Sequence, residues 1–279
     1  LGVIVGVFPI VRRLLQRLER LQAGVRRWGE GDLSVRVPEH GSDEVAELAR
    51  QFNAAAARIE ALLAAHKSLL ANASHELRSP LARIRMAIEL VGAQGSPTAR
   101  AEIQRNIAEL DQLVDEILLA SRLDAREADM GTVEPVDLIG LVAEESARVG
   151  AALEVPDGSG DIIVPGVAKL LRRAVRNLLE NAARHGSAGQ VSAGLSLADG
   201  HAELHVDDRG PGVPEAQRER IFEPFYRLPG ASEREGGVGL GLALVRSIAE
   251  RHGGSAQCDN CPGGGARFTL RLPTARHAA

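Results

Sequence analysis

The sequence is poor in several kinds of residue, and each shortage excludes a class of protein. Aromatic residues make up 3% of the 279 residues, too few to line a groove that stacks single-stranded nucleic acid. The formal net charge is -4, so no strongly basic surface is available for a nucleic-acid backbone. We therefore expect no nucleic-acid partner. The content of 44% hydrophobic and 25% charged residues is typical of a globular chain with a substantial core.

Cysteine is also scarce. The two cysteines, Cys258 and Cys261, cannot form a disulfide framework. The pair could be a redox pair or an incidental CxxC beside a glycine-rich turn. No second pair of ligands accompanies it, as a structural zinc site would require. We assign the two cysteines no role.

The first ten residues are apolar and uncharged, and Arg12 and Arg13 follow at once. Ten residues cannot cross a bilayer that needs about 20. We interpret residues 1–10 as the inner end of a membrane helix, with the arginines marking the cytoplasmic side. The alternative is the start of an ordinary buried helix. The first interpretation predicts a location at the cytoplasmic face of the cell membrane (inner or plasma membrane).

Two amphipathic helices joined by an irregular connector are predicted within residues 11–63. In the first helix, apolar residues keep helical spacing until Gly29, Gly31 and Pro38 break the pattern. Ser42 is the expected N-cap of the second helix. Because the apolar stripe of that helix must be buried, we expect a parallel bundle formed with a second copy. The stripe consists of Val45, Leu48, Phe52, Ala55, Ile59 and Leu62.

A helical hairpin is predicted over residues 64–125, with a break between Gly92 and Pro97. Its broad apolar faces predict a four-helix bundle in a homodimer. The apolar positions of its first helix are Leu70, Leu77, Leu81, Ile84 and Ile88.

A linker over residues 126–134 and an α+β domain over residues 135–275 are predicted to follow. Strands are expected at 162–164, 191–197, 202–206 and 266–272, and helices at 167–185 and 240–252.

His75 lies on the hairpin's first helix in a direction roughly 160° from its apolar stripe, so it should point into solvent. It could be an inert surface histidine, but its neighbours favour chemistry. Glu76 adjoins it, Ser79 lies one turn on, and Pro80 removes a backbone donor and should kink the helix there. A neutral imidazole whose other nitrogen bonds a carboxylate is a good nucleophile, as phosphoryl capture requires.

Residues 74–81 read SHELRSPL and resemble the H box of sensor histidine kinases. The resemblance implies that His75 is autophosphorylated and that Glu76 is its general base. Ser79 stands where the family often has Thr or Asn, a position tied to phosphatase action on the partner. The segments GDL at 31–33 and DEV at 43–45 resemble a HAMP signal-relay domain. The hairpin resembles the dimerisation and phosphotransfer domain.

Three further segments have the chemistry of a nucleotide site. Asn177 and Asn181 lie one helical turn apart, so their amide oxygens can reach one Mg²⁺. Asp208 begins the turn DRGPG after an alternating strand and can accept a hydrogen bond from an exocyclic amine. The stretch GVGLGL at 237–242 precedes a helix, where backbone amides suit phosphate oxygens. A Rossmann fold is excluded because no parallel βαβ unit surrounds this stretch.

In chain order these segments resemble the N, G1 and G2 boxes of the histidine-kinase ATP-binding domain, and residues 221–227 (IFEPFYR) resemble the F box between them. The matching stretches span residues 9–272. The resemblance implies that Asp208 holds the adenine amino group, that Asn181 holds Mg²⁺, and that Asn177 and Arg184 face the phosphates. It also implies roles for the glycines of the turn and of the ATP lid, which are Gly210, Gly212, Gly237, Gly239 and Gly241.

The sequence thus predicts a multidomain, homodimeric, ATP-dependent protein-histidine kinase that phosphorylates His75. The acceptor aspartate would lie on a separate response regulator, because the chain contains no receiver domain, and the resemblance also allows phosphatase action toward that regulator. The alternative is a nucleotide-binding signalling scaffold without catalysis. A gyrase-type ATPase is disfavoured because Asn177 takes the place of its water-activating glutamate, and Glu180 is expected on a different face.

Overall fold

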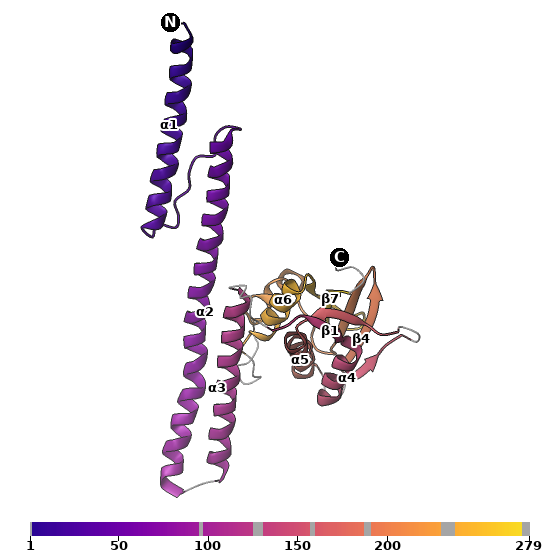
Figure 1. The fold of residues 1–279 in the computed structure, drawn as a ribbon. Helices are drawn as coiled ribbons and strands as arrows, with labels where there is room; N and C mark the ends of the chain where they lie inside the picture. Colours follow the sequence, from indigo (N-terminus) through magenta and orange to yellow (C-terminus); the bar gives the residue numbers. More distant parts are fainter. Residues whose placement is uncertain are drawn as a thin grey trace. The chain divides into compact units, whose positions relative to one another are not determined.

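Figure 1 shows the computed structural model, which describes residues 2–94, 97–124, 131–156, 160–186, 191–229 and 238–274. The chain divides into two compact units, residues 1–71 and 72–279. Across these described ranges, no helix has an apolar stretch long enough to cross a membrane.

The first unit begins with two helices that run in the same direction (Figure 1). Helix α1 spans Gly2–Gly29, and α2 begins at Glu44 after an extended connector. The N-cap of α2 is Asp43 and not the predicted Ser42, because Asp43 Oδ1 accepts the third helical N–H at 3.0 Å. Arg17 of α1 also donates to the Asp43 carboxylate, so one residue starts α2 and ties it to α1.

The core of the first unit is small and is built around the connector. Asn53 holds the backbone of Val37 from both sides, accepting its N–H at 2.9 Å and donating to its carbonyl at 2.8 Å. Trp28 packs edge-on against Phe52, with ring centroids 6.0 Å apart. The buried apolar residues of this unit include Leu21, Val35, Val37, Ala46, Ala49 and Ala56.

The apolar stripe predicted on α2 is only partly covered. Val45 and Phe52 are half-buried, whereas Leu48, Ile59 and Leu62 are exposed. The positions that α2 buries are mostly alanines, because small side chains allow close approach between backbones. The large residues of the stripe are therefore left on the surface of the single chain.

Helix α2 continues to Gln94, and α3 runs back beside it over Pro97–Asp124, so the predicted break in the hairpin is confirmed (Figure 1). Helix α2 passes through Pro80 without ending. Arg83 connects the two helices by donating to Asn106 at 2.7 Å and to Glu109 at 2.6 Å.

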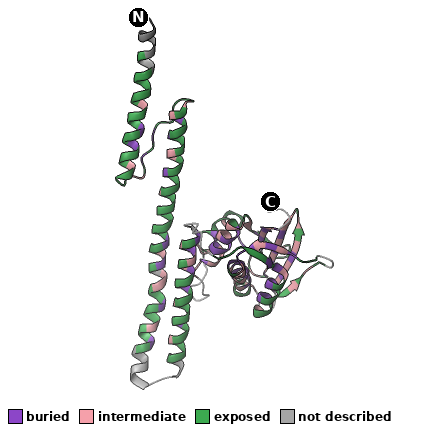
Figure 2. Ribbon diagram, in the orientation of Figure 1, coloured by how far each residue is buried: buried purple, intermediate pink, exposed green. Residues whose placement is uncertain are grey.

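The hairpin buries small residues together with Leu69, Leu113 and Leu123, and it leaves many of its other large apolar residues exposed. Ala73, Pro80 and Ala87 are buried, whereas much of the predicted apolar stripe is exposed. Figure 2 shows the same pattern, with exposed residues along most of both helices. The exposed large residues of the hairpin, called here the exposed stripe, are Leu70, Leu81, Met86, Ile88, Ile107, Val114 and Leu118.

The remainder of the second unit is an α+β domain. Its five-stranded sheet has the order β2-β4-β5-β7-β6, and the pair β1 and β3 forms a separate antiparallel sheet. The helices are α4 (Leu138–Val149), α5 (Ala168–His185) and α6 (Gly241–Arg251). The strands are β1 (Glu134–Asp137), β2 (Ala152–Glu154), β3 (Ile163–Gly166), β4 (Ser192–Ala198), β5 (His201–Asp207), β6 (Ser255–Asn260) and β7 (Ala266–Pro273).

Alternation places one face of the sheet in the core. Ala202, Leu204 and Val206 of β5 are fully buried, and the residues between them are half-buried. The helices supply the other layer, with Leu171 and Val175 of α5 fully buried. The α+β domain therefore closes its core within one chain.

The predicted strands and helices of this domain are found within one to two residues of their expected ends. The elements α4, β1, β2 and β6 were not predicted. Residue 134, the predicted end of the linker, already belongs to β1, where Glu134 pairs with Gly166. The strands β2 and β6 lie at the edges of the sheet, and short edge strands carry little periodic signal.

Two polar contacts fix α5, the helix that carries the paired asparagines. Glu145 of α4 is 1% exposed and accepts hydrogen bonds from Arg172 and Arg176 of α5 at 2.9–3.0 Å. His252, just after α6, accepts the N–H of Val167 at 3.1 Å, at the N-cap of α5. Helix α5 is thus held at its start and along its length.

Candidate nucleotide site

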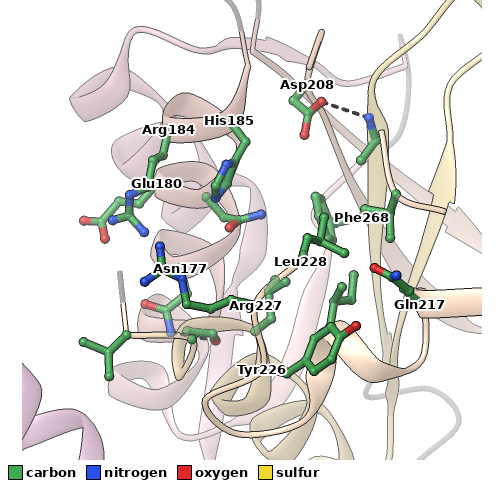
Figure 3. A pocket seen from close by; sticks show the side chains of 18 of the residues that line it. Asn177, Glu180, Arg184, His185, Asp208, Gln217, Tyr226, Arg227, Leu228 and Phe268 are labelled. Carbon is green, nitrogen blue, oxygen red and sulfur yellow. Dashed lines mark hydrogen bonds between the residues drawn. The ribbon is translucent and has the colours of Figure 1, made fainter. Parts of the chain in front are cut away.

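A cavity of about 970 Å³ lies beside α5 within the second unit (Figure 3). Its walls come from α3, α5, the turn after β5, the segment 226–229 and the start of α6. Of the predicted site residues, those that line it are Asn177, Asn181, Arg184, Asp208, Gly212, Gly239 and Gly241.

The α5 wall presents residues spaced three and four apart. Asn177 is 6% exposed, and its Nδ2 donates to the carbonyl of Gly241 at 3.0 Å. This bond ties α5 to the first residue of α6. Asn181 and Arg184 lie further along the same wall.

Asp208 lies near the end of α5 that carries His185, and hydrogen bonds fix the orientation of its carboxylate (Figure 3). It is 3% exposed, and its Oδ1 accepts hydrogen bonds from the N–H groups of Gly210 and Ala266, both at 2.9 Å. Among the residues that the structure describes, none donates to its second oxygen, Oδ2. A buried carboxylate with one oxygen anchored can present the other to a donor on a ligand.

The residues just before α6 lie against the backbone of residues 225 and 226. Gly239 has φ +79°, and a Cβ there would lie 2.9 Å from the backbone of Phe225 and Tyr226. The N–H of Phe225 donates to the carbonyl of Gly239 at 2.9 Å. Glycine is required at this close approach. Phe222 of the same segment is buried, with 2% exposure.

The other predicted glycines differ in outcome. Gly210 contributes its N–H to Asp208 but does not line the cavity. Gly237 lies outside the described residues.

The predicted phosphoacceptor segment lies apart from the cavity. His75 has a helical backbone in α2, but its side chain lies outside what the structure describes, so its predicted outward direction stays a prediction. Glu76 is half-buried and Ser79 is exposed. No α2 residue is part of the described cavity lining.

One expectation about α5 is wrong. Glu180 was expected on a different face from Asn177, yet both line the cavity (Figure 3). Residues three apart on a helix are separated by only about 60°, so they share a face. The same spacing rule, applied to Asn181, would have indicated His185, which also lines the cavity.

Several other lining residues were not predicted. Gln217 and Asn260 come from segments without a recognisable motif, and Glu109 and Glu116 come from α3. The α3 carboxylates are neutralised by arginines, because Glu109 pairs with Arg83 at 2.6 Å and Glu116 pairs with Arg173 of α5 at 2.7 Å.

The two cysteines show no sign of reactivity. Both are free thiols. Burial raises the pKa of Cys258 to about 12, and burial also raises the pKa of Cys261. A thiol that stays protonated is a poor nucleophile and a poor metal ligand.

Comparison with known protein families gives three matches along the chain. Residues 10–61 match the HAMP domain, residues 65–126 match the His Kinase A (phospho-acceptor) domain, and residues 166–276 match the family of histidine kinase-, DNA gyrase B-, and HSP90-like ATPases. The predicted order of HAMP segment, helical hairpin and α+β ATPase domain is confirmed.

Individual relatives agree with these matches. Sensor protein RstB of Escherichia coli strain K12 is 34% identical over 278 residues, covering 96% of this chain and 62% of RstB. The signal transduction histidine-protein kinase/phosphatase MprB of Mycobacterium sp. strain KMS is 34% identical over 281 residues, covering 95% of this chain and 54% of MprB. The chain thus spans between half and two thirds of these curated relatives.

Among solved structures, full-length ShkA in complex with AMPPNP is similar in fold and sequence. Its TM-score is 0.52 at 28% identity, and the similarity covers 76% of this chain and 47% of ShkA. Three family matches in this order, with named sensor kinases similar over nearly the whole chain, show that the chain belongs to the sensor histidine kinases of two-component systems.

Proposed function

We propose that this chain is an ATP-dependent protein-histidine kinase that transfers the γ-phosphoryl group of Mg-ATP to His75 and then to an aspartate of a separate response regulator. The observation that carries the proposal is the cavity, which combines an oriented Asp208 with the asparagine face of α5. The match to the ATPase family and the AMPPNP complex of ShkA support ATP as the nucleotide.

At the base end, Asp208 would accept a hydrogen bond from the adenine amino group. Its Oδ1 is occupied by two backbone donors, so Oδ2 is the oxygen that would meet the amine. Guanine carries a carbonyl oxygen at this position. That oxygen cannot donate a hydrogen bond, and the carboxylate would repel it. The arrangement therefore favours adenine nucleotides.

At the phosphate end, Asn177, Arg184 and the glycines 237, 239 and 241 would contact phosphate oxygens. The donor set fits Mg²⁺, because Asn181 and Glu180 supply oxygen ligands on one wall of the cavity. Mg²⁺ would neutralise phosphate charge when bound. Arg184 adds a second positive charge, which would orient the triphosphate.

At the histidine end, a neutral His75 nitrogen would attack the γ-phosphorus in line, and the bond to the ADP oxygen would break. Glu76 would hydrogen-bond the other ring nitrogen and accept its proton. Because His75 does not belong to the cavity, the α+β domain must deliver the nucleotide to it. The N–P bond would then break as the phosphoryl group passes to the regulator's aspartate.

The proposal includes a homodimer, attachment to the membrane through residues 1–10, and Ser79 as a participant in phosphatase action on the regulator. The exposed stripe of the hairpin supports the homodimer, since a second hairpin would cover it. The name of MprB, a kinase/phosphatase, supports the phosphatase part.

Labelling with γ-³²P-ATP and Mg²⁺ tests the kinase proposal. We expect acid-labile, alkali-stable label that is lost in His75→Gln and retained in His66→Gln, a matched change at an exposed histidine on the same helix. Asn181→Ala should lose Mg²⁺-dependent labelling while still binding the dimer partner. Equal label in His75→Gln and the parent chain would show that the nucleophile is misassigned.

The alternative of a silent scaffold makes a different prediction. A scaffold would bind AMPPNP and Mg²⁺ but incorporate no label. Binding without label in the parent chain, at a protein concentration that supports dimers, would favour the scaffold.

A further inference from the structure

The edge strand β6 ends against the turn that follows Asp208. Asn260, its last residue, lines the nucleotide cavity. Its Oδ1 accepts a hydrogen bond from the N–H of Val213 at 2.8 Å, across 47 positions of sequence. None of the motifs identified in the sequence includes Asn260.

The neighbouring residue of β6, Asp259, pairs with the arginine that approaches the other polar backbone group of Val213, its carbonyl. Asp259 pairs with Arg218 at 3.1 Å, and Nε of Arg218 lies 3.5 Å from the carbonyl oxygen of Val213. The Arg218 contact with Val213 is 3.5 Å long and the Asn260 contact is 2.8 Å long, so Asn260 makes the stronger of the two. Both polar backbone groups of Val213 are thus held by side chains that β6 supplies or orients.

The turn is also packed closely against Asn260. Gly212 has φ +74°, and a Cβ there would lie 2.9 Å from Asn260 Oδ1. Glycine satisfies both the left-handed backbone and the close approach. Val213 itself is 5% exposed, so an unpaired N–H there would be costly.

Two hydrogen bonds to side chains therefore hold the turn from Gly210 to Val213. Asp208 Oδ1 holds its start by accepting the Gly210 N–H, and Asn260 Oδ1 holds its end. If the end is released, the start can shift, and Asp208 loses one of the two donors that orient its carboxylate.

We propose that Asn260 is a positioning residue for nucleotide binding, acting through the turn 210–213 on Asp208 and on the cavity wall. This inference rests on the proposed function of the cavity. Asn260 acts at the end of the cavity where Asp208 would bind the adenine base. We therefore expect β6 to affect the affinity for the nucleotide and not the phosphoryl-transfer step.

The test compares two substitutions of similar size. Asn260→Leu removes the acceptor, and Asn260→Asp retains an oxygen at the same place. We expect Asn260→Leu to raise the Kd for AMPPNP and the KM for ATP about tenfold, the effect of one positioning hydrogen bond, with kcat within about twofold of the parent. Asn260→Asp should keep most of the affinity.

Gln257→Leu is the matched control, since Gln257 is exposed on the same strand, and it should leave Kd, KM and kcat unchanged. An unchanged Kd in Asn260→Leu, or an equal loss in Asn260→Asp, would overturn the assignment. A fall in kcat at unchanged KM would overturn it as well.

If Asn260→Leu does not fold, Arg218→Met tests the inference in its place. We expect this substitution to raise the Kd for AMPPNP roughly threefold. An unchanged Kd would contradict the inference. Failure of the proposed function itself has a distinct signature, because the parent chain would then bind no AMPPNP.

Discussion

The helical hairpin and the α+β domain use apolar residues in opposite ways. In the α+β domain Leu179 and Leu204 are fully buried, whereas in the hairpin Leu81 and Ile88 are 55% and 56% exposed. Both regions contain many leucine and isoleucine residues. The difference therefore lies in geometry and not in composition.

A sheet covered by helices encloses a core by itself, because alternation turns half of each strand toward the helices. Two antiparallel helices cannot do this, since their broad apolar faces are wider than the contact between the two helices can cover. The hairpin buries alanines and a few leucines, and the residues of the exposed stripe remain uncovered in the single chain. The comparison teaches that the α+β domain can be stable alone and that the hairpin depends on a partner.

The largest expected effect comes from removing core volume in the α+β domain. Leu179→Ala should destabilise that domain by about 2–5 kcal/mol, the range for a fully buried leucine. Leu81→Ala should leave it unchanged within about 0.5 kcal/mol. Hydrogen exchange of β5 amides, followed by mass spectrometry, measures both. Faster exchange in Leu81→Ala than in Leu179→Ala would break the comparison.

The next effect concerns the dimer. Leu118→Asp places a charge in the exposed stripe and should raise the dimer dissociation constant at least about 100-fold, because a buried carboxylate is costly. Arg105→Asp, at an exposed polar position of the same helix, is the control. Sedimentation equilibrium reports both. A dimer as tight in Leu118→Asp as in Arg105→Asp would exclude the stripe as the interface.

A smaller effect is expected at the buried carboxylate that anchors α5. Hydrogen bonds from Arg176 and Arg172 lower the pKa of Glu145 below its ordinary value of 4.5. A lowered pKa stabilises the folded state above pH 4.5, and this stabilisation is lost as the pH falls through the folded pKa.

Glu145→Gln should therefore cost about 2 kcal/mol at pH 7 and reduce the loss of stability below pH 4.5. Urea midpoints between pH 7 and pH 3.5 measure this. An unchanged pH dependence in Glu145→Gln would refute the role of this carboxylate.

The smallest effect is expected at His252. Its Nε2 accepts the Val167 N–H, and its Nδ1 lies 2.7 Å from the Ile248 carbonyl, so the neutral ring with a proton on Nδ1 satisfies both partners. Burial lowers the pKa of His252 below 6.5, and the charge of Arg251 lowers it further. The stabilisation is complete above pH 6.5 and is lost as the pH falls through the folded pKa.

His252→Gln should weaken the stability change in this acidic range, at a cost of about 1 kcal/mol at pH 7 for the lost bond. Thermal unfolding at pH 7.5 and pH 5.5 tests it. A parent chain that is equally stable at both values would contradict the assignment.

Much of the candidate site could be predicted because its residues follow local rules. Asn177 and Asn181 share a helix face by spacing alone, and Asp208 stands at the end of an alternating strand. Asn260 could not be found in this way, since it lies on an edge strand with little periodicity, and its partner Val213 is 47 positions away. Glu116 was missed for the same reason, because its partner Arg173 lies on another element.

The sequence by itself determined the order of the three domains and predicted which groups are reactive, because helical periodicity, turn residues and motif spacing are local properties. Only the tertiary structure decided which oxygen of Asp208 is anchored, which strand holds the turn 210–213, and which apolar residues one chain leaves uncovered. These depend on contacts between distant segments, whose distances and directions are set by packing and not by any short pattern.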